Sequence, residues 1–162
     1  MASTAVLGFH HATALASDAQ RNVDFYAGVL GLRLVKRSVN QDAPDIYHLF
    51  YADAVGSPGT DITFFPWHNI APTYEGAGMI TETALCVPEA SLPYWSDRLR
   101  AAGVAVESTE LALGVPALRF RDPDGLRLAL VGTGDSRPFV AWEHSPVPVE
   151  HQIRGLFAAR LT

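Results

Sequence analysis

Residues 8–32, GFHHATALASDAQRNVDFYAGVLGL, contain the pattern that decides the fold. The first nine of these residues predict a strand that ends before Ser17. Ser17 is followed three positions later by Gln20, which is the spacing of a capping box at a helix start. Apolar residues then recur at helical spacing, and Gly31 supplies a C-cap. The stretch therefore predicts a strand followed by an amphipathic helix over 18–30.

The same order of elements occurs twice along the chain. Strands are expected after the first helix over 32–39, 46–52 and 60–65. A strand over 79–87 and a helix from Ser91 to Gly103 then begin the second half, followed by strands over 104–107, 116–121 and 126–131. The chain is therefore an internal repeat of two βαβββ units, and an offset of 71 residues aligns His11 with Glu82.

A single βαβββ unit has one sheet with a helix on one face, so the other face needs cover. Two units side by side curl their sheets around a concave cavity. The expected fold class is α+β, with two units forming an open curved barrel and a C-terminal extension. We predict units over 8–66 and 79–132 within a domain over 1–134, and expect 135–162 to be a connector and the start of a third unit.

Composition excludes several classes of protein. The chain has 162 residues, of which 48% are hydrophobic and 18% charged, as in a folded domain rather than a disordered tail. The net charge of −5, with no basic run, argues against nucleic acid or an anionic membrane as a partner. We see no membrane-spanning run and no signal peptide, and the single Cys86 cannot form an internal disulfide. A cytoplasmic location is therefore expected.

Several motifs resemble the vicinal oxygen chelate superfamily, which includes glyoxalases, bleomycin-resistance proteins and extradiol dioxygenases. These motifs are FHHAT at 9–13, NVDFY at 22–26 and VLGLRLV at 29–35. VKRSVN at 35–40 and FFPW at 64–67 narrow the resemblance to ring-cleaving dioxygenases that act on hydroquinone-type aromatics. The chain resembles the N-terminal half of such enzymes. The turn DPDG at 122–125 is typical of the superfamily only.

The resemblance implies a metal site. In dioxygenases of this superfamily the metal is usually Fe(II), held by two histidines and one carboxylate and open to substrate and O2. The resemblance places one ligand on His11, and the aligned Glu82 is the second candidate ligand. His10 and Thr13 are the candidate catalytic residues, for proton transfer and for hydrogen bonding to the substrate. Mn(II), Zn(II) or the absence of any metal are the alternatives.

The chain supplies too few ligands for such a site. Glyoxalase-like proteins often carry a glutamate four residues after the turn glycine, and Ala129 stands at that position. Ring-cleaving dioxygenases of this type usually contain four units, and their remaining ligands lie in the second half. A homodimer or a partner chain is therefore expected to supply further ligands.

Three functions are compatible with these residues. The first is a metal-dependent extradiol-type ring-cleaving dioxygenase, or one half of one, that takes a hydroquinone-like or catechol-like aromatic and O2. The second is a metal-free small-molecule binding module of the bleomycin-resistance type, with Phe65, Trp67 and Tyr74 lining its groove. The third is a glyoxalase-type isomerase, which Ala129 disfavours. His48 is expected to be a core or supporting side chain.

Overall fold

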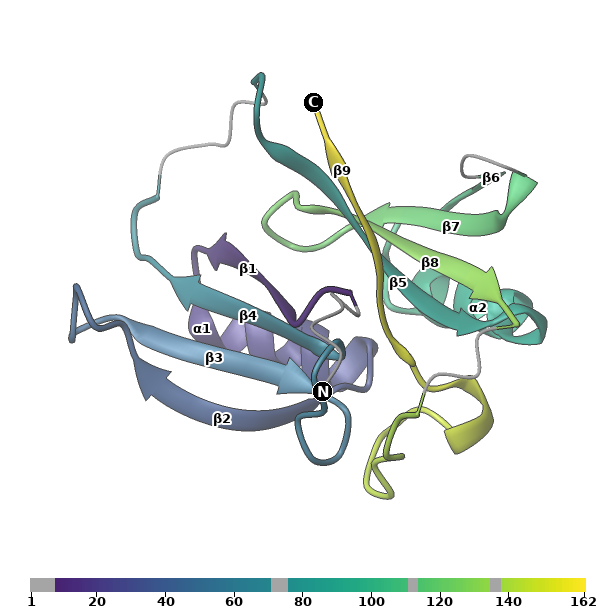
Figure 1. Ribbon diagram of the computed structural model, residues 1–162, viewed down its shortest axis with the longest axis horizontal. Helices are drawn as coiled ribbons and strands as arrows, with labels where there is room; N and C mark the ends of the chain where they lie inside the picture. Colours follow the sequence, from purple (N-terminus) through teal and green to yellow (C-terminus); the bar gives the residue numbers. More distant parts are fainter. Residues whose placement is uncertain (1–7, 71–75, 111–113, 135–137) are drawn as a thin grey trace, which may run out of the picture.

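The computed structural model describes residues 8–70, 76–110, 114–134 and 138–162. Two β-sheets lie side by side, and each has a helix against one face (Figure 1). The sheets are curved and open, and neither closes into a barrel. The expected α+β class with an open, glyoxalase-like arrangement is therefore confirmed. In the described part of the chain, the helices are too short or too polar to cross a membrane.

The first sheet has the order β1-β4-β3-β2. Its strands are β1 (His11–Ala16), β2 (Arg33–Val39), β3 (Tyr47–Ala52) and β4 (Asp61–Pro66). The last strand, β4, lies between β1 and β3, parallel to β1 and antiparallel to β3. Since β4 takes the place beside it, β1 is left at the edge of the sheet.

The helix of the first unit differs from the prediction in its start and in its second half. It consists of α1 (Ala19–Val23) and a π-helical segment η1 (Asp24–Val29). The N-cap is Asp18, whose carboxylate accepts a hydrogen bond from the Arg21 N–H, so the capping role predicted for Ser17 is wrong. The Ser17 hydroxyl instead donates to Asp124 in the second unit.

The second sheet repeats the first with one addition. Its order is β6-β7-β8-β5-β9, built from β5 (Ile80–Pro88), β6 (Glu107–Glu110), β7 (Pro116–Arg121), β8 (Arg127–Thr133) and β9 (Gly155–Leu161). β5 is parallel to β8, as β1 is to β4, and β9 adds an antiparallel strand to the other edge of β5. The predicted strand over 104–107 is displaced, because β6 begins only at Glu107.

The helix of the second unit matches its prediction closely. It is α2 (Leu92–Ala101), preceded by a 3-10 turn, η2 (Glu89–Ser91). The Ser91 hydroxyl makes no capping bond and donates instead to the Glu150 carbonyl, so the connector satisfies it. Between the helices and the sheets lies one core, whose largest fully buried side chains include Tyr26, Tyr51, Phe64, Trp95 and Leu128.

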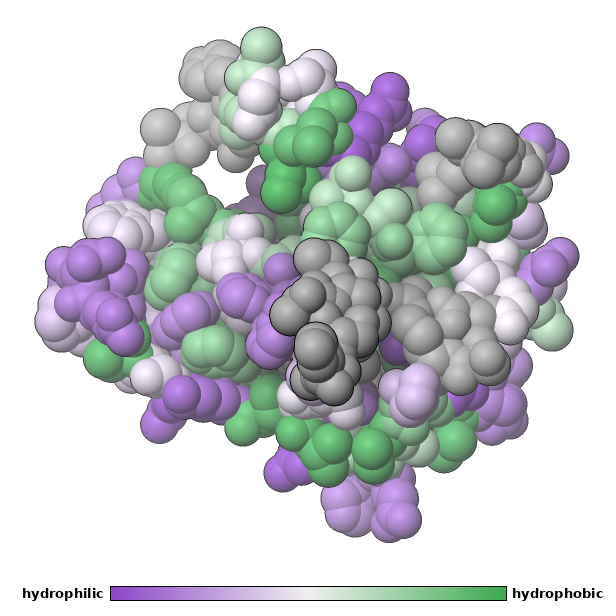
Figure 2. Space-filling view, viewed as in Figure 1, coloured by the Kyte–Doolittle hydropathy of each residue, from purple (hydrophilic) through white to green (hydrophobic). Residues whose placement is uncertain are grey.

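The connector before β9 runs along the first unit. The Val140 N–H donates to the Asp53 carboxylate, and the Ser145 hydroxyl donates to the Gly31 carbonyl. A short 3-10 turn, η4 (Val149–His151), leads into β9. Figure 2 shows hydrophobic patches along the lower edge of the molecule, where Figure 1 shows the connector. The connector is thus hydrogen-bonded to the first unit at both of these points.

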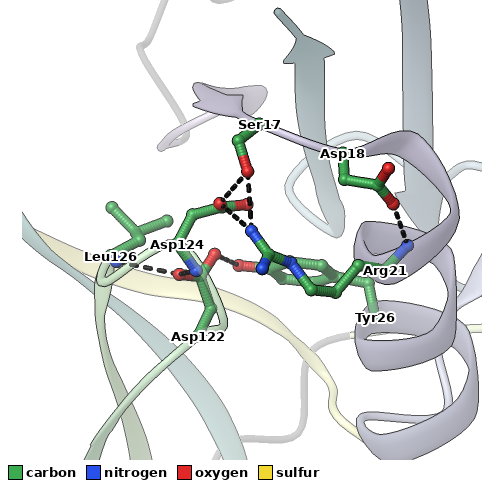
Figure 3. Close-up of polar contacts among 7 residues, drawn as sticks. All are labelled: Ser17, Asp18, Arg21, Tyr26, Asp122, Asp124 and Leu126. Atoms are coloured by element: carbon green, nitrogen blue, oxygen red, sulfur yellow. Dashed lines mark hydrogen bonds and ion pairs between the residues drawn. The ribbon is translucent and has the colours of Figure 1, made fainter. Parts of the chain in front are cut away.

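Several close contacts join the units. Gly155 has φ +134° and lies so near the first unit that a Cβ would come within 2.6 Å of the Gly59 carbonyl oxygen. The buried Tyr26 hydroxyl donates to Asp122 over 3.0 Å, and Asp124 accepts from Arg21 as well as from Ser17 (Figure 3). The DPDG turn of one unit is thus hydrogen-bonded to the helix of the other.

Candidate functional site on the open face of the first sheet

The alternation of β1 decides which side chains are available for function. Ala12 and Ala14 pack against the core, so His11, Thr13 and Leu15 face the opposite side and are exposed. The parallel register places Asp61 beside His11, and Thr63 and Phe65 beside the next two outward positions. We call this side of the first sheet its open face.

A row of hydrogen bonds crosses the open face. The Thr63 hydroxyl donates to the Thr13 hydroxyl over 2.9 Å, and the Nε2 atom of His48 lies 3.0 Å from the Thr63 oxygen. The Thr63 hydroxyl has one proton, which it donates to Thr13. In the hydrogen bond between His48 and Thr63, His48 is therefore the donor and carries its proton on Nε2. Burial, followed by the nearby His11 and Lys36, lowers the pKa of His48, which favours this neutral form.

Aromatic rings surround that row. The His48 ring lies between Phe50 and Phe65, with centroid distances of 4.0 Å and 4.1 Å. The Lys36 ammonium group lies 5.4 Å from the Phe50 centroid, within the range of a cation–π contact. His48 therefore lies on the open face rather than in the core, and whether it supports a site there stays a prediction.

The two adjacent histidines reach the same place. β1 begins at His11, so His10 precedes the strand and does not follow its alternation. Their Nδ1 atoms are 3.2 Å apart, and both side chains are exposed. The Oδ1 atom of Asp61 is buried and has no hydrogen-bond partner. Burial raises the pKa of the Asp61 carboxyl, and the two histidines oppose that shift.

The structure places Glu82 away from these residues, in the second sheet. Glu82 is buried, and its two carboxylate oxygens accept from Arg119 over 2.7 Å and 3.3 Å. The Arg119 side chain is 31% exposed, while its guanidinium group pairs with the buried Glu82. A cavity of about 640 Å³ extends from this ion pair toward Arg121, Arg127 and Arg160.

The face of the second sheet that corresponds to the open face is filled with small apolar side chains. Ala84, Ala117, Ala129 and Val131 form a buried cluster there, and Ala129 is fully buried. No group of three His, Cys, Asp or Glu side chains suited to a metal occurs in the described part of the chain. The described residues alone thus do not make a three-ligand site. Of the groove residues, Trp67 is exposed and Tyr74 lies outside the described residues.

Comparisons with known proteins agree with this arrangement. The family model of the Glyoxalase/Bleomycin resistance protein/Dioxygenase superfamily matches residues 8–130. MhqA of Bacillus subtilis, named as a candidate ring-cleaving dioxygenase, is 43% identical over 97% of this chain and 50% of its own length. A chlorohydroquinone/hydroquinone 1,2-dioxygenase of Sphingobium indicum is 33% identical over 93% of this chain and 48% of its own.

Solved structures support the same fold. A candidate dioxygenase of Bacillus subtilis superposes with a TM-score of 0.86 at 39% identity, over 96% of this chain and 49% of that chain. A glyoxalase/bleomycin resistance/dioxygenase domain from Frankia superposes with a TM-score of 0.65 at 19% identity, which shows a shared fold only. The chain spans about half the length of the curated relatives it matches.

Proposed function

Because the chain belongs to the glyoxalase/bleomycin resistance protein/dioxygenase superfamily, we propose that it forms one half of a ring-cleaving dioxygenase for hydroquinone-type aromatics. One observation carries the proposal: the exposed His11 lies beside the ordered row of Thr13, Thr63 and His48 on the open face. The relatives named as ring-cleaving and hydroquinone dioxygenases support the substrate class.

His11 is the residue that would ligate the metal, Fe(II) in the first instance. When bound, such a metal would supply Lewis-acid and redox chemistry for the reaction of a phenolic substrate with O2. Glu82 would have to leave Arg119 to reach it, so we propose that the further donors come from outside this chain. Asp61, beside His11 and with an unsatisfied buried oxygen, is the carboxylate of this chain that lies nearest in the sheet register.

The other residues of the open face bind and orient the aromatic substrate. The Thr13 hydroxyl has its proton free and donates to a substrate oxygen, because Thr63 already donates to it. His10 accepts the proton of a phenolic hydroxyl, since a neutral imidazole suits proton transfer near neutral pH. Phe50 and Phe65 supply an apolar wall beside the ring.

Metal content tests this proposal directly. The chain is loaded with Fe(II) without oxygen, and bound iron is measured for wild type, His11→Ala and the control His144→Ala, which removes an exposed histidine of the connector. We expect bound iron in wild type and the control and its loss in His11→Ala. Iron that stays bound after His11→Ala, or the absence of iron binding and of hydroquinone-dependent O2 uptake in every variant, would contradict it.

A metal-free binding module of the bleomycin-resistance type is the second candidate. The buried alanine cluster around Ala129 favours it, because Ala129 cannot bind a metal and Glu82 on the same face is held by Arg119. Under this alternative, hydroquinone binds to the metal-free chain with the same affinity before and after His11→Ala. Calorimetric titration of both proteins distinguishes the two candidates.

A further inference from the structure

We propose that Lys36 binds the second oxygen of a hydroquinone-type substrate, the oxygen opposite the one that Thr13 contacts. Lys36 thereby selects rings whose two oxygens lie at opposite ends over rings whose oxygens are adjacent. The position of Lys36 on the open face follows from strand register. The identity of the ligand rests on the function proposed above.

A β-bulge turns the Lys36 side chain onto the open face. Leu34 lies opposite Tyr51 and packs against the core, so in a regular strand Lys36, two positions later, would face the core as well. The register instead shifts between Leu34 and Lys36, and Lys36 lies opposite Phe50. The extra residue is Val35. Bulges commonly re-aim side chains in this way beside active sites, so the strand is built to present Lys36 on this face.

Lys36 ends a row of side chains that crosses the first sheet from edge to edge (Figure 1). In the strand register this row runs through Thr13, Thr63, Phe50 and Lys36. Three strand spacings separate its ends, so the Cα atoms of Thr13 and Lys36 lie about 14 Å apart.

The polar groups at the two ends of the row lean toward each other. The Thr13 hydroxyl accepts a hydrogen bond from Thr63 on the neighbouring strand, which turns it toward the middle of the sheet. The Lys36 ammonium group reaches inward from the other edge and lies 5.4 Å from the Phe50 centroid. The space between these groups suits one benzene ring that carries an oxygen at each end.

The charge of Lys36 is not neutralised by a carboxylate of the described residues. The ion pairs in that part of the chain are Arg21–Asp124 and Arg119–Glu82, and neither includes Lys36. The Phe50 ring beside the ammonium group offers no hydrogen-bond acceptor. Because lysine has three donors and no acceptor, this group is suited to bind an oxygen that carries negative charge.

The second unit has the same row but a different use for it. In strand register the equivalent positions are Ala84, Ala129, Arg119 and Glu107, and the offset of 71 residues holds at both ends of the row. Alanines replace the two threonines, and the cation of the row, Arg119, is paired with Glu82. The first unit thus keeps hydroxyls and a cation where the second unit has apolar packing and an ion pair.

The separation of the two ends explains how Lys36 distinguishes substrates. Hydroquinone held at Thr13 presents its second oxygen to Lys36, whose ammonium group donates to that oxygen and favours its ionised form. Catechol held at Thr13 has both oxygens at the same end and presents only carbon and hydrogen to Lys36. A hydrogen bond from a charged donor contributes more than a neutral one, so Lys36 favours hydroquinone over catechol and over phenol.

Calorimetric titration in the absence of oxygen measures this selectivity. Hydroquinone, phenol and catechol are titrated into wild type, Lys36→Met and the control Arg37→Met. Arg37 is the next residue of β2, and its guanidinium carbon lies 5.4 Å from the Tyr47 centroid on the opposite face of the sheet. We expect Lys36→Met to weaken hydroquinone binding roughly tenfold and to leave phenol and catechol binding unchanged. Arg37→Met is expected to match wild type.

A conservative variant separates charge from shape. Lys36→Arg keeps a positive charge and hydrogen-bond donors, so it is expected to keep most of the preference for hydroquinone over phenol. A preference that survives Lys36→Met, or that Arg37→Met removes equally, would overturn the role of Lys36. A wild-type chain that binds hydroquinone no more tightly than phenol would overturn it too.

Bound iron, measured in the same preparations, separates this inference from the proposed function. Iron that depends on His11, together with equal binding of hydroquinone and phenol, leaves the proposed function standing and contradicts the role of Lys36. A preference that depends on Lys36 in a chain that binds no iron supports the role of Lys36 and matches the metal-free alternative. Failure of wild type to bind any of the three aromatics contradicts both proposals.

Discussion

The two units have the same order of strands and helix, but their equivalent sheet faces differ in polarity and exposure. On the open face of the first sheet, His11, Thr13 and His48 are accessible and connected through Thr63. On the equivalent face of the second sheet, Ala129 is fully buried in an alanine-rich cluster, and Glu82 is held by Arg119. The two units therefore share a backbone arrangement but not their side-chain chemistry. The first sheet exposes polar side chains on this face, whereas the second sheet buries an apolar cluster on the equivalent face.

The largest expected effect comes from placing a carboxylate on the packed face. Ala129→Glu buries a charge among apolar side chains without a partner, which costs about 4 kcal/mol of unfolding free energy. The matched change on the open face, Leu15→Glu, alters stability by less than about 0.5 kcal/mol, because that side chain is half exposed. Urea unfolding measures both, and similar losses would show that the two faces do not differ as described.

A smaller effect is expected where the units meet. Gly155→Ala puts a Cβ within 2.6 Å of the Gly59 carbonyl at a φ of +134°, and it costs about 3 kcal/mol. Gly103→Ala has a φ of +75° but nothing within 4 Å, so only the backbone term of about 1 kcal/mol applies. Comparing the thermal unfolding midpoints of Gly155→Ala and Gly103→Ala separates the cost of the contact with Gly59 from the cost of the positive φ angle. Equal losses would mean that the contact with Gly59 adds nothing.

The hydrogen bond between the helix of one unit and the turn of the other has a moderate expected effect. Tyr26→Phe removes the hydroxyl that donates to Asp122 in the buried junction, at a cost of about 2 kcal/mol. Tyr47→Phe, the control on the exposed side of β3, is expected to change little, since that ring is 47% exposed. Denaturant midpoints test the pair, and an unchanged midpoint for Tyr26→Phe would remove this link between the units.

The smallest expected effect is a pH dependence at the same junction. Burial raises the pKa of the Asp122 carboxyl above its ordinary value of 3.8, although hydrogen bonds from Leu126 and Tyr26 oppose the shift. The folded protein then binds this proton more tightly than the unfolded chain does. The stability due to Asp122 is therefore present at low pH and is lost as pH rises through the raised pKa.

Asp122→Asn removes the titratable carboxyl group and keeps a side-chain oxygen that can accept hydrogen bonds from the backbone of the turn. The stability of wild type relative to Asp122→Asn should fall as pH rises from about 4, measured by urea unfolding at a series of pH values. Asp18→Asn, an exposed N-cap whose amide oxygen also caps a helix, is the control. A wild-type advantage that grows with pH would contradict the direction of this shift.

Local sequence patterns predicted the fold well because they depend on neighbouring residues. The strand of 8–16, the helix ending at Gly31 and the DPDG turn all occur near their predicted positions. The misplaced features depended on distant partners. Local pattern could not show that the Ser17 hydroxyl donates to Asp124 or that the Ser91 hydroxyl donates to the connector. Those acceptors are far away in the sequence.

The candidate site divides in the same way. The pair His10–His11 and the outward position of Thr13 follow from motif and alternation. The role of His48 required Thr63, which β4 brings between β1 and β3. An alternating pattern with polar threonines on one face of 61–65 was the available signal, although it does not show which strand lies beside it.

The sequence by itself determined the repeat of two βαβββ units and the side of β1 on which His11 lies, because periodicity and turn chemistry are local properties. Only the tertiary structure decided that Glu82 pairs with Arg119, that Thr13, Thr63 and His48 form one row, and that β9 covers β5 while β1 remains an edge. The physical reason is that hydrogen bonds and ion pairs between strands depend on strand order and register, which residues distant in the chain set together.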